Sequence, residues 1–471
     1  MTDVPDQSSN IHTAFCFEHR SRLGKSAWQL LLAGLAAHSL MACAVDTDAP
    51  SDEPLGSSQA AVLLPGDIVV QKPTFPRPFP PFPLPDPEEL IQISAGNAHT
   101  CALKRNGNVY CWGRDDFGQV GNSPNATCRS APNKCVDRPT RVYSFGGFPA
   151  ASQIDAGDHH SCALDGSGKA YCWGNGDQGQ VGIASVTGWF FEPLAVSGNL
   201  SFTSLSAGTM TTCGTTAAGV FCWGLPIPSN VPQSEVGRTS PTQIYAQTGL
   251  SPVGISVGYR HVCAQWVSGS YRETNCWGYD WSGQTGAPWA PYSLLGQGPN
   301  VGTAALRVAT QGSFTCVDQP VGVMCFGGGG SGQLGSGITA NTHLAQQVGG
   351  FAPGGTPMAL HGVSTGQYHA CALDPNGYAY CWGSGAWGQL GHGLRPDGYA
   401  DNSSLPVAVT GGRRFKSIAA GERHTCGIGI DNLIYCWGSN YAGELGTQYK
   451  SPGQPYTNGW VADPVQTQPP I

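Results

Sequence analysis

The stretch that decides the fold is Gly421-Glu-Arg-His-Thr-Cys-Gly-Ile428, followed by Leu433-Ile-Tyr-Cys-Trp-Gly438 and then by Gly443-Glu-Leu-Gly446. The same order of motifs recurs six more times upstream. The clearest other copies begin at Gly96, with Gly-Asn-Ala-His-Thr-Cys-Ala-Leu, and at Gly366, with Gly-Gln-Tyr-His-Ala-Cys-Ala-Leu. Self-similarity at roughly 50–60 residues indicates a repeat architecture in which each copy forms one structural unit.

Each copy carries two cysteines, and their spacing predicts a β-hairpin. The predicted disulfide pairs are Cys101 with Cys111, Cys162 with Cys172, Cys213 with Cys222, Cys263 with Cys276, Cys316 with Cys325, Cys371 with Cys381, and Cys426 with Cys436. In four copies the spacing is ten, so the chain folds about Asn106, Ser167, Asn376 or Asp431, and the next residue is Gly or Asn. This is the pattern of a type I turn closed by a left-handed residue. The third, fourth and fifth copies need other loop lengths.

The predicted hairpin has two apolar faces. Cys101 lies opposite Cys111 and Leu103 opposite Val109 on one face, and Trp112 lies on the other, because side chains alternate along a strand. Opposed residues are about 4.5–5.5 Å apart at Cβ, which suits a disulfide. One hairpin cannot bury both faces alone, but stacked copies can. Seven copies of mostly strand therefore favour a closed β-propeller.

The motifs resemble the regulator of chromosome condensation repeat family. The resemblance rests on Gly-x-x-His-x-Cys-Ala-Leu, x-Tyr-x-Trp-Gly and Gly-Gln-Leu-Gly, and it runs from about Ile91 to the end of the chain. It implies an all-β fold, a seven-bladed β-propeller of four-stranded blades. Cysteine at both hairpin positions departs from the eukaryotic nuclear member of the family.

The C-terminal strand is predicted to close the ring. After each copy a variable loop leads to a Pro-x-x-Val strand, such as Pro139–Val142 or Pro406–Val409. No such strand precedes the first copy, and a spare one, Val461–Val465, follows the last. We therefore predict that the C-terminal strand completes blade one, which removes the exposed sheet edges that invite aggregation.

Residues 1–43 are predicted to be an export signal. Basic residues from Arg20 to Lys25 precede an apolar run, Trp28–Ala42, that is too short to span a bilayer. The run ends in Leu40-Met-Ala-Cys43, which resembles a bacterial lipoprotein box and implies lipidation of Cys43. The alternative is cleavage after Ala44, which discards that cysteine. The predicted location is a membrane-anchored lipoprotein of the bacterial cell envelope, touching the membrane only through its lipid, or a secreted protein.

Residues 44–89 are predicted to be a tether, acidic at first and then rich in proline over Pro73–Pro85. Proline at this density favours extended polyproline II at ~3.1 Å per residue. The tether would hold the propeller, residues 90–471, away from a membrane. The alternative is a proline-rich ligand for a partner domain.

The cysteine count favours an oxidising compartment. Eighteen cysteines less Cys16 and Cys43 leave sixteen, of which fourteen are the repeat pairs and the last two are Cys128 and Cys135. An even set in plausible pairs indicates disulfides. Zinc is the rival, but the repeat pairs lack the Cys-x₂-Cys clustering of common zinc sites. We predict no metal and no cofactor.

Five copies carry a histidine two residues before the first cysteine: His99, His160, His261, His369 and His424. Neighbours in a seven-fold ring of about 10 Å radius lie about 9 Å apart, too far to share a zinc ion. We expect each imidazole to be buried and bonded to backbone within its own blade, since buried polar groups need partners. The acidic loops at Asp115-Asp116 and Asn175–Asp177 are expected to be solvated turns rather than calcium sites.

The composition restricts the function. The net charge is −7, which argues against a nucleic-acid partner because phosphate binding needs clustered Lys and Arg. No nucleophile elbow or acid–base pair is evident. Departures from the repeat gather in the loops, where binding usually lies. The exposed aromatics predicted to bind are Trp189, Phe190, Phe191, Trp289 and Tyr292, although they equally fit rings packed beneath their own loops.

The sequence therefore predicts a monomeric, non-enzymatic binding scaffold of the envelope or the secreted fraction, with an unidentified protein partner. One alternative is guanine-nucleotide exchange on a small GTPase, the activity that the resemblance implies for the nuclear member. Another is a glycan-binding surface protein, which fits the loop tryptophans. The last is a lyase or hydrolase working in the central funnel.

Overall fold

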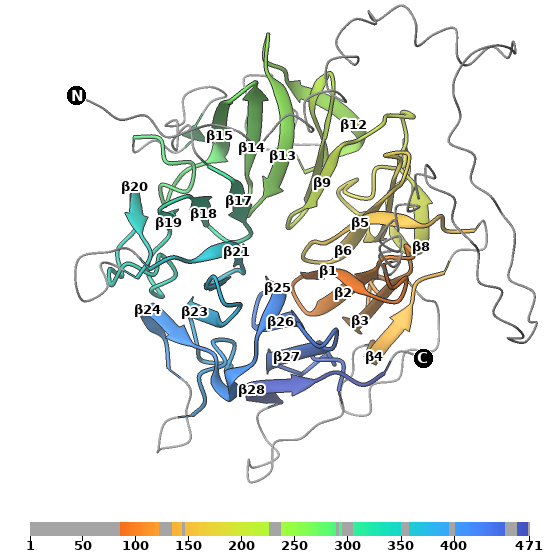
Figure 1. Ribbon diagram of the computed structural model, residues 1–471. Coiled ribbons are helices and arrows are strands. Elements are labelled where there is room, and N and C mark those ends of the chain that lie inside the picture. Colours follow the sequence, from red (N-terminus) through yellow and green to blue (C-terminus); the bar gives the residue numbers. More distant parts are fainter. Residues whose placement is uncertain are drawn as a thin grey trace, which may run out of the picture. The chain divides into compact units, whose positions relative to one another are not determined.

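The computed structural model describes residues 85–121, 134–143, 147–225, 237–288, 305–349, 358–394, 401–447 and 459–469, with the backbone alone at 292–293. Within this part of the chain seven four-stranded antiparallel sheets form a ring of blades (Figure 1). Among the described residues the only helical element is the 3-10 turn η1 (Thr410–Gly412). The predicted all-β, seven-bladed propeller of four-stranded blades is confirmed.

Each blade uses four strands that follow one another in the sequence. Blade one contains β1 (Leu90–Ala95), β2 (His99–Lys104), β3 (Val109–Arg114) and β4 (Cys135–Arg141), and blade two contains β5 (Ala151–Ala156), β6 (His160–Asp165), β7 (Ala170–Asn175) and β8 (Trp189–Ala195). Blade three contains β9 (Ser204–Ala207), β10 (Thr211–Thr216), β11 (Gly219–Gly224) and β12 (Arg238–Tyr245). Blade four contains β13 (Ser251–Val257), β14 (His261–Ser268), β15 (Tyr271–Tyr279) and β16 (Tyr292–Ser293).

The remaining three blades repeat this order. Blade five contains β17 (Arg307–Thr310), β18 (Phe314–Gln319), β19 (Gly322–Gly327) and β20 (Thr342–Gln347). Blade six contains β21 (His361–Thr365), β22 (His369–Leu373), β23 (Ala379–Gly383) and β24 (Ser403–Ala408). Blade seven contains β25 (Phe415–Ala420), β26 (His424–Gly429), β27 (Ile434–Ser439) and β28 (Trp460–Gln466).

The two ends of the ring are different surfaces. Neighbouring strands of a blade are antiparallel, so the connections between first and second strands and between third and fourth strands meet at one end. We call this end the loop face. The hairpins between second and third strands and the links from blade to blade lie at the other end, the hairpin face. The first strands surround the axis of the ring (Figure 1).

The prediction that the C-terminal strand completes blade one is wrong. Strand β28 pairs with β27 and is the fourth strand of blade seven, with Val465 opposite Cys436. Blade one has its own fourth strand, β4, which contains Pro139. Each Pro-x-x-Val segment thus completes the blade that it follows, because a returning loop brings the chain back beside the third strand it has just left.

Blades seven and one close the ring through packing and hydrogen bonds instead of a shared strand. Ile93 and Trp112 of blade one share a buried cluster with Ile428, Leu445 and Val461 of blade seven. The C-terminal strand therefore contributes to the closure through its side chains, as part of blade seven.

The predicted hairpins are confirmed in their turns. The residues expected to close them are left-handed, with φ of 83° at Gly107, 83° at Gly168, 86° at Gly377 and 65° at Asn432. Leu103 lies opposite Val109 as predicted. The local chemistry of the turn therefore fixes the register of each of these hairpins.

All seven repeat pairs form disulfides between the second and third strands of their blades, at a Cα–Cα distance of 4.1 Å. The four pairs with a separation of ten residues are Cys101 with Cys111, Cys162 with Cys172, Cys371 with Cys381, and Cys426 with Cys436. The three pairs with separations of 9, 13 and 9 residues are Cys213 with Cys222, Cys263 with Cys276, and Cys316 with Cys325. In every pair the two cysteines are directly opposed in the strand register.

The cysteines outside the repeat pairs are only partly described. Cys135 is disulfide-bonded, and its predicted partner Cys128 lies outside the described residues, as do Cys16 and Cys43. Seven disulfides in the repeats indicate a protein of an oxidising, extracytoplasmic environment.

The predicted export signal and nearly all of the predicted tether fall outside the described residues, which begin at 85. No helix in the described part of the chain is long and apolar enough to span a bilayer.

Candidate functional site

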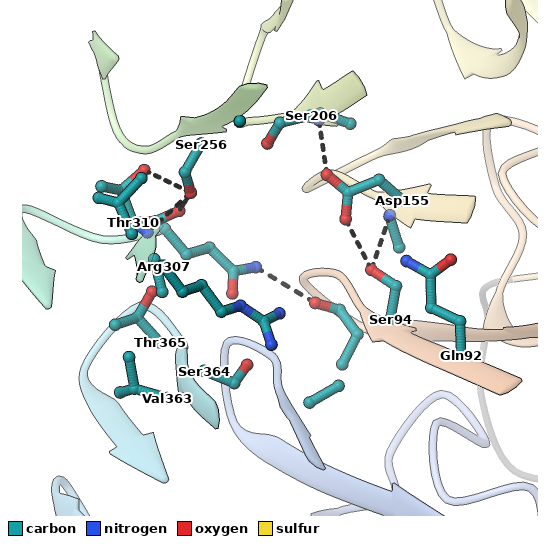
Figure 2. A pocket seen from close by; sticks show the side chains of 18 of the residues that line it. Gln92, Ser94, Asp155, Ser206, Ser256, Arg307, Thr310, Val363, Ser364 and Thr365 are labelled. Atoms are coloured by element: carbon teal, nitrogen blue, oxygen red, sulfur yellow. Dashed lines mark hydrogen bonds between the residues drawn. The ribbon is translucent and has the colours of Figure 1, made fainter. Parts of the chain in front are cut away.

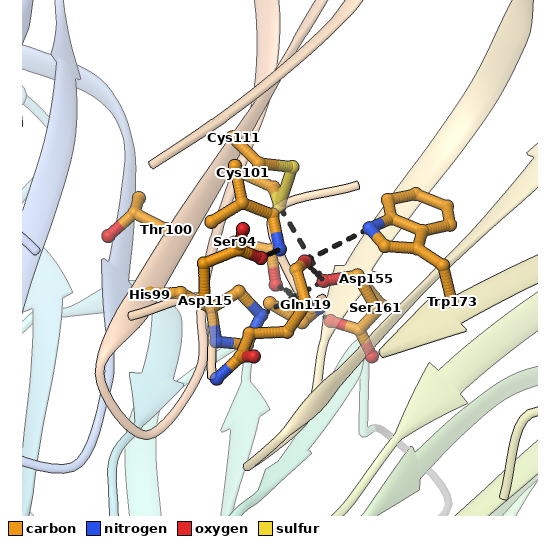
Figure 3. The surroundings of a disulfide bond; sticks show 12 residues. Ser94, His99, Thr100, Cys101, Cys111, Asp115, Gln119, Asp155, Ser161 and Trp173 are labelled. Atoms are coloured by element: carbon orange, nitrogen blue, oxygen red, sulfur yellow. Dashed lines mark hydrogen bonds between the residues drawn. A yellow bond between two sulfur atoms is a disulfide. The ribbon is translucent and has the colours of Figure 1, made fainter. Parts of the chain in front are cut away.

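The five predicted histidines are buried and link each blade to the next one. Figure 3 shows the first link, in which His99 Nε2 lies 2.9 Å from Ser161 Oγ of blade two. The other four pairs have Nε2–Oγ1 distances of 2.8–3.0 Å and are His160–Thr212, His261–Thr315, His369–Thr425 and His424–Thr100. The expected backbone partner within the same blade is wrong, because the hydroxyl of the next blade takes that place.

The hydroxyl also fixes the tautomer of the imidazole. Ser161 Oγ donates its only hydrogen to the carbonyl of Gln119 at 2.9 Å, so it must accept from His99 Nε2–H. The indole of Trp173 donates to the same carbonyl at 2.9 Å (Figure 3). Nδ1 of His99 has no hydrogen-bond partner among the described residues. At the equivalent position in blade six, burial lowers the pKa of His369 to about 3. That imidazole is therefore neutral at pH 7 and has a structural role.

A sequence signal could have revealed these links. Every copy that carries the histidine is followed by a copy with Ser or Thr just before its first cysteine. The two copies without it, which have Thr211 and Phe314, are followed by Val262 and Ala370. Phe314 and Ala370 share one buried cluster. The apolar pair therefore replaces the polar one at the same junction.

We predict that Thr425→Val destabilises the protein and that the double variant His369→Phe/Thr425→Ala restores most of the loss. The single change leaves the buried Nε2–H of His369 without an acceptor, which costs about 1–3 kcal/mol. The double change copies the junction at Phe314 and Ala370. Urea denaturation at pH 7 checks both, and a double variant as unstable as the single one would contradict the exchange.

Comparison of the wild type with the double variant isolates the contribution of His369 to the pH dependence of stability. The pKa of His369 is about 3 when folded against an ordinary 6.5. Its contribution to stability is thus complete above pH 6.5 and lost as the pH falls toward 3. Relative to the double variant, the wild type should lose up to about 1.4 kcal/mol per pH unit below 6.5. If the stability difference between the two proteins is the same at pH 7 and pH 4.5, His369 keeps its ordinary pKa in the folded protein.

The acidic turn at Asp115 is buried, so the expectation of a solvated turn is wrong there. Asp115 is 2% exposed, and its Oδ1 accepts from the amide of Val120 at 3.0 Å. Burial raises its pKa to about 7. Asp280 binds the amide of Thr285 in the same way, at 2.8 Å. Both carboxyls cap the turn after the third strand. Among the described residues no group of three His, Cys, Asp or Glu side chains is placed to hold a metal ion.

Only one of the predicted binding aromatics is shown to be well exposed. Trp189 is 53% exposed at the loop face, donates to Asp177 Oδ2 at 3.0 Å and packs edge-on against Phe117. Phe190 packs against the buried cluster between blades two and three, and Phe191 lies against Gly118 of blade one. These two rings are therefore packed against the protein, as in the alternative to a binding role.

The other two predicted binding aromatics cannot be compared in this way. Trp289 lies outside the described residues. Tyr292 is placed in β16 by its backbone.

The loop face carries five further exposed side chains that the sequence reasoning missed. They are Trp281 (69% exposed), Tyr441 (51%), Tyr259 (46%), Tyr368 (44%) and Met210 (42%). Trp281 and Tyr441 occupy the first position of the turn after the third strand, where other copies have Asp116 or Asp177. An aromatic ring at a turn position that is aspartate in blades one and two was the available signal. The loop face thus presents both of the strongly exposed tryptophans among the described residues.

The axis of the ring holds a polar chamber of about 460 Å³ (Figure 2). Many of its polar side chains form hydrogen bonds between neighbouring blades. Gln92 Nε2 donates to the carbonyl of Ile154 at 2.7 Å, and its Oε1 accepts from the amide of the same residue at 3.0 Å. Asp155 accepts from Ser94 Oγ and the amide of Ala207, each at 2.8 Å. Burial raises the pKa of Asp155.

The regulator of chromosome condensation (RCC1) repeat matches four of these blades. One repeat model covers residues 90–119, 151–180, 361–389 and 415–444, and a second covers 106–164 and 376–428. Together they match blades one, two, six and seven.

Two curated proteins are similar along most of the chain. The ultraviolet-B receptor UVR8 of Arabidopsis thaliana is 26% identical over 381 residues, which cover 76% of this chain and 79% of the receptor. The human regulator of chromosome condensation is 27% identical over 367 residues, covering 77% of this chain and 75% of that protein.

The solved structure of human WBSCR16 has the same fold. Its TM-score is 0.63 at 18% identity, covering 77% of this chain and 94% of that one, so the likeness concerns the fold alone. The chain therefore carries regulator of chromosome condensation repeats in four of its blades, and it is similar to the two curated relatives along about three quarters of its length.

Proposed function

We propose that this protein is a non-enzymatic binding scaffold of the cell envelope or the extracellular space, and that its loop face engages a protein partner. The observation that carries the proposal is the group of exposed aromatics on one end of a rigid ring: Trp189, Trp281, Tyr259, Tyr368 and Tyr441. Exposed Trp and Tyr are the side chains that most often dominate the energy of protein interfaces. Loops held by a rigid scaffold are where binding residues usually lie.

Two of these aromatics, Tyr441 and Trp189, are held in place before any partner arrives. The guanidinium of Arg423 lies 5.1 Å from the ring centre of Trp387, which packs edge-on against Tyr441 at 5.7 Å. Phe117 and Trp189 form a similar pair at 5.2 Å. Side chains that are already ordered lose less entropy on binding. These pairs therefore suit a preformed interface.

We expect Trp281→Ala to weaken the binding of a stoichiometric partner by about 10-fold or more, as for an interface hot spot. The oxidised full-length chain is the bait for solubilised envelope and secreted proteins of the native cell, and the affinity of the captured partner is then measured with purified components. Tyr143→Ala is the matched control, because Tyr143 is 55% exposed on the hairpin face.

Three results would count against the proposal. Equal losses for both variants, or none for Trp281→Ala, would remove the loop face from the interface. Retention on cell-wall polysaccharide with no protein partner would replace the proposal with glycan binding, the role that exposed tryptophans also fit.

Guanine-nucleotide exchange is the alternative that the relatives raise. A solved structure of yeast Prp20p, which matches this fold at TM-score 0.60, is described with its binding to Gsp1p and histones. Those partners are Prp20p's. Seven disulfides oppose a cytosolic role for this chain, since cytosolic thiols are kept reduced. We therefore rank exchange below an extracytoplasmic scaffold.

We also propose that Cys43 carries a lipid that anchors the tether to a membrane. The support is the Leu-Met-Ala-Cys sequence after an apolar run. We expect wild-type protein in the membrane fraction and Cys43→Ala in the soluble fraction, with a mass on the N-terminal cysteine of the wild type that matches diacylglycerol addition. An unmodified N-terminus beyond residue 44 in the wild type would mean ordinary cleavage and secretion.

A further inference from the structure

At one level of the channel wall, the residues of blades four, five and six differ from those of the other blades. Nine residues before the first cysteine, the copies carry Gln92, Gln153, Ser204, Gly254, Arg307, Gly362 and Ser417. Arg307 is the one cationic side chain among the described residues that line the chamber. It begins the first strand of blade five and so lies at the hairpin-face end of the channel. The sequence alone gives no reason for a charge at this level.

In blade five a different residue, Asp318, makes the contact with the next blade that this position makes in blades one and two. In blades one and two the glutamine binds the backbone of the next blade. In blade five Asp318 does so, because its carboxylate accepts from the amides of Gly362 at 2.8 Å and Val363 at 3.1 Å. The exposed Arg307 guanidinium makes no direct hydrogen bond or salt bridge with the described residues, and its charge acts at a distance on the Asp318 carboxylate of the paired strand, whose pKa burial raises and this charge lowers. Figure 2 shows it pointing into the chamber.

The neighbouring blades leave room beside Arg307. Gly254 and Gly362 flank it at the same level and present no side chain. A Cβ placed on Gly362 would meet no atom within 4 Å, and one on Gly254 would first meet the Gln265 amide at 3.0 Å. Neither glycine therefore places a side chain beside Arg307, although Gln265 of blade four also lines the chamber.

The opposite end of the chamber is narrowed by one side chain. Five residues before the first cysteine, six copies have glycine and blade five has Gln311. Its amide lies 3.4 Å from the carbonyl of Ala95 across the channel. With its nitrogen turned toward blades six and seven it donates to Thr365 and Ala420, both at 2.8 Å. Gln311 therefore narrows the chamber on its loop-face side, at a level where the other copies have glycine.

We propose that the chamber binds a small oxyanion, a carboxylate or phosphate group, which enters from the hairpin face and pairs with Arg307. Arginine binds both groups through paired N–H donors. Ser364 supplies a second donor on the adjacent blade: its Oγ accepts from the amide of Ala420 at 3.0 Å, and its hydrogen has no acceptor among the described residues. Asp155 is covered by Ser94 and Ala207. This site is separate from the proposed protein-binding face and does not depend on it.

Calorimetric titration of the oxidised full-length protein with citrate, and separately with inorganic phosphate, tests the site. We expect saturable binding of at least one probe, weakened about 10- to 100-fold in Arg307→Gln by loss of a charge-assisted pair. Glutamine stands at this position in blades one and two, so the variant should keep its thermal midpoint. Arg272→Gln removes an exposed cation from the hairpin face outside the chamber and should bind as the wild type does.

The two probes separate the sources of the anion. Binding of citrate alone assigns a carboxylate ligand, and binding of phosphate alone assigns a phosphate ligand. Saturation with neither probe, equal binding by Arg307→Gln, or an equal loss in Arg272→Gln would overturn the assignment.

Discussion

Reduction of the seven repeat disulfides is expected to abolish the cooperative stability of the propeller at 25 °C. Each bond closes a hairpin of 9 to 13 residues, which in the chain-entropy account is worth about 2–3 kcal/mol. The seven loops do not overlap in the sequence, so their contributions combine. Their sum, about 14–21 kcal/mol by this account, equals or exceeds the roughly 5–15 kcal/mol that stabilises a typical protein.

The measurement is the urea midpoint of the oxidised protein and of protein reduced in mild denaturant, alkylated and returned to buffer. The bonds are buried, so a reductant alone will act slowly. Replacing one pair, Cys213→Ala with Cys222→Ala, should cost about 2–3 kcal/mol by the same account. A reduced, alkylated protein that unfolds at the urea concentration of the oxidised one would show that packing alone holds the ring.

Gly366→Ala is expected to destabilise the protein by about 3 kcal/mol or more, at the upper end of overpacking effects. A Cβ at this position would lie 2.0 Å from the carbonyl oxygen of Gly421 and 2.8 Å from Cε1 of His369. Blades six and seven would have to separate, which also strains the hydrogen bond between His369 and Thr425.

Gly166→Ala is the matched control for this change. It lies in the hairpin of blade two, and a Cβ there meets no atom within 4 Å. We expect it to be neutral or to stabilise the protein by about 0.4–1 kcal/mol through the unfolded chain. Both variants are compared by urea denaturation. Equal midpoints for Gly366→Ala and wild type would mean that the blades separate at little cost.

Blade five shows how the fold tolerates Gln311 where the other copies have this glycine. The close approach has moved by one residue, and a Cβ on Gly312 would lie 2.1 Å from the carbonyl of Gln367. The glycine requirement is therefore kept one residue later, and position 311 carries the side chain that narrows the chamber.

The sequence by itself determined the units of this protein. The turn at Asn106 and Gly107 and the pairing of Cys101 with Cys111 could be predicted, because they join residues within about ten positions of one another. Hydrophobic alternation and turn chemistry act over this range. The number of blades followed from counting the copies.

Only the tertiary structure decided how the units meet. The partner of His99 is 62 residues away in blade two, and that of His424 is 324 residues away in blade one. The C-terminal strand fitted either end blade by its pattern, and the ring placed it in blade seven. The tertiary structure likewise decided that Trp281 is exposed at the loop face and that Phe191 packs against blade one. Contacts between blades depend on the closed ring, which brings together residues that no local rule of sequence connects.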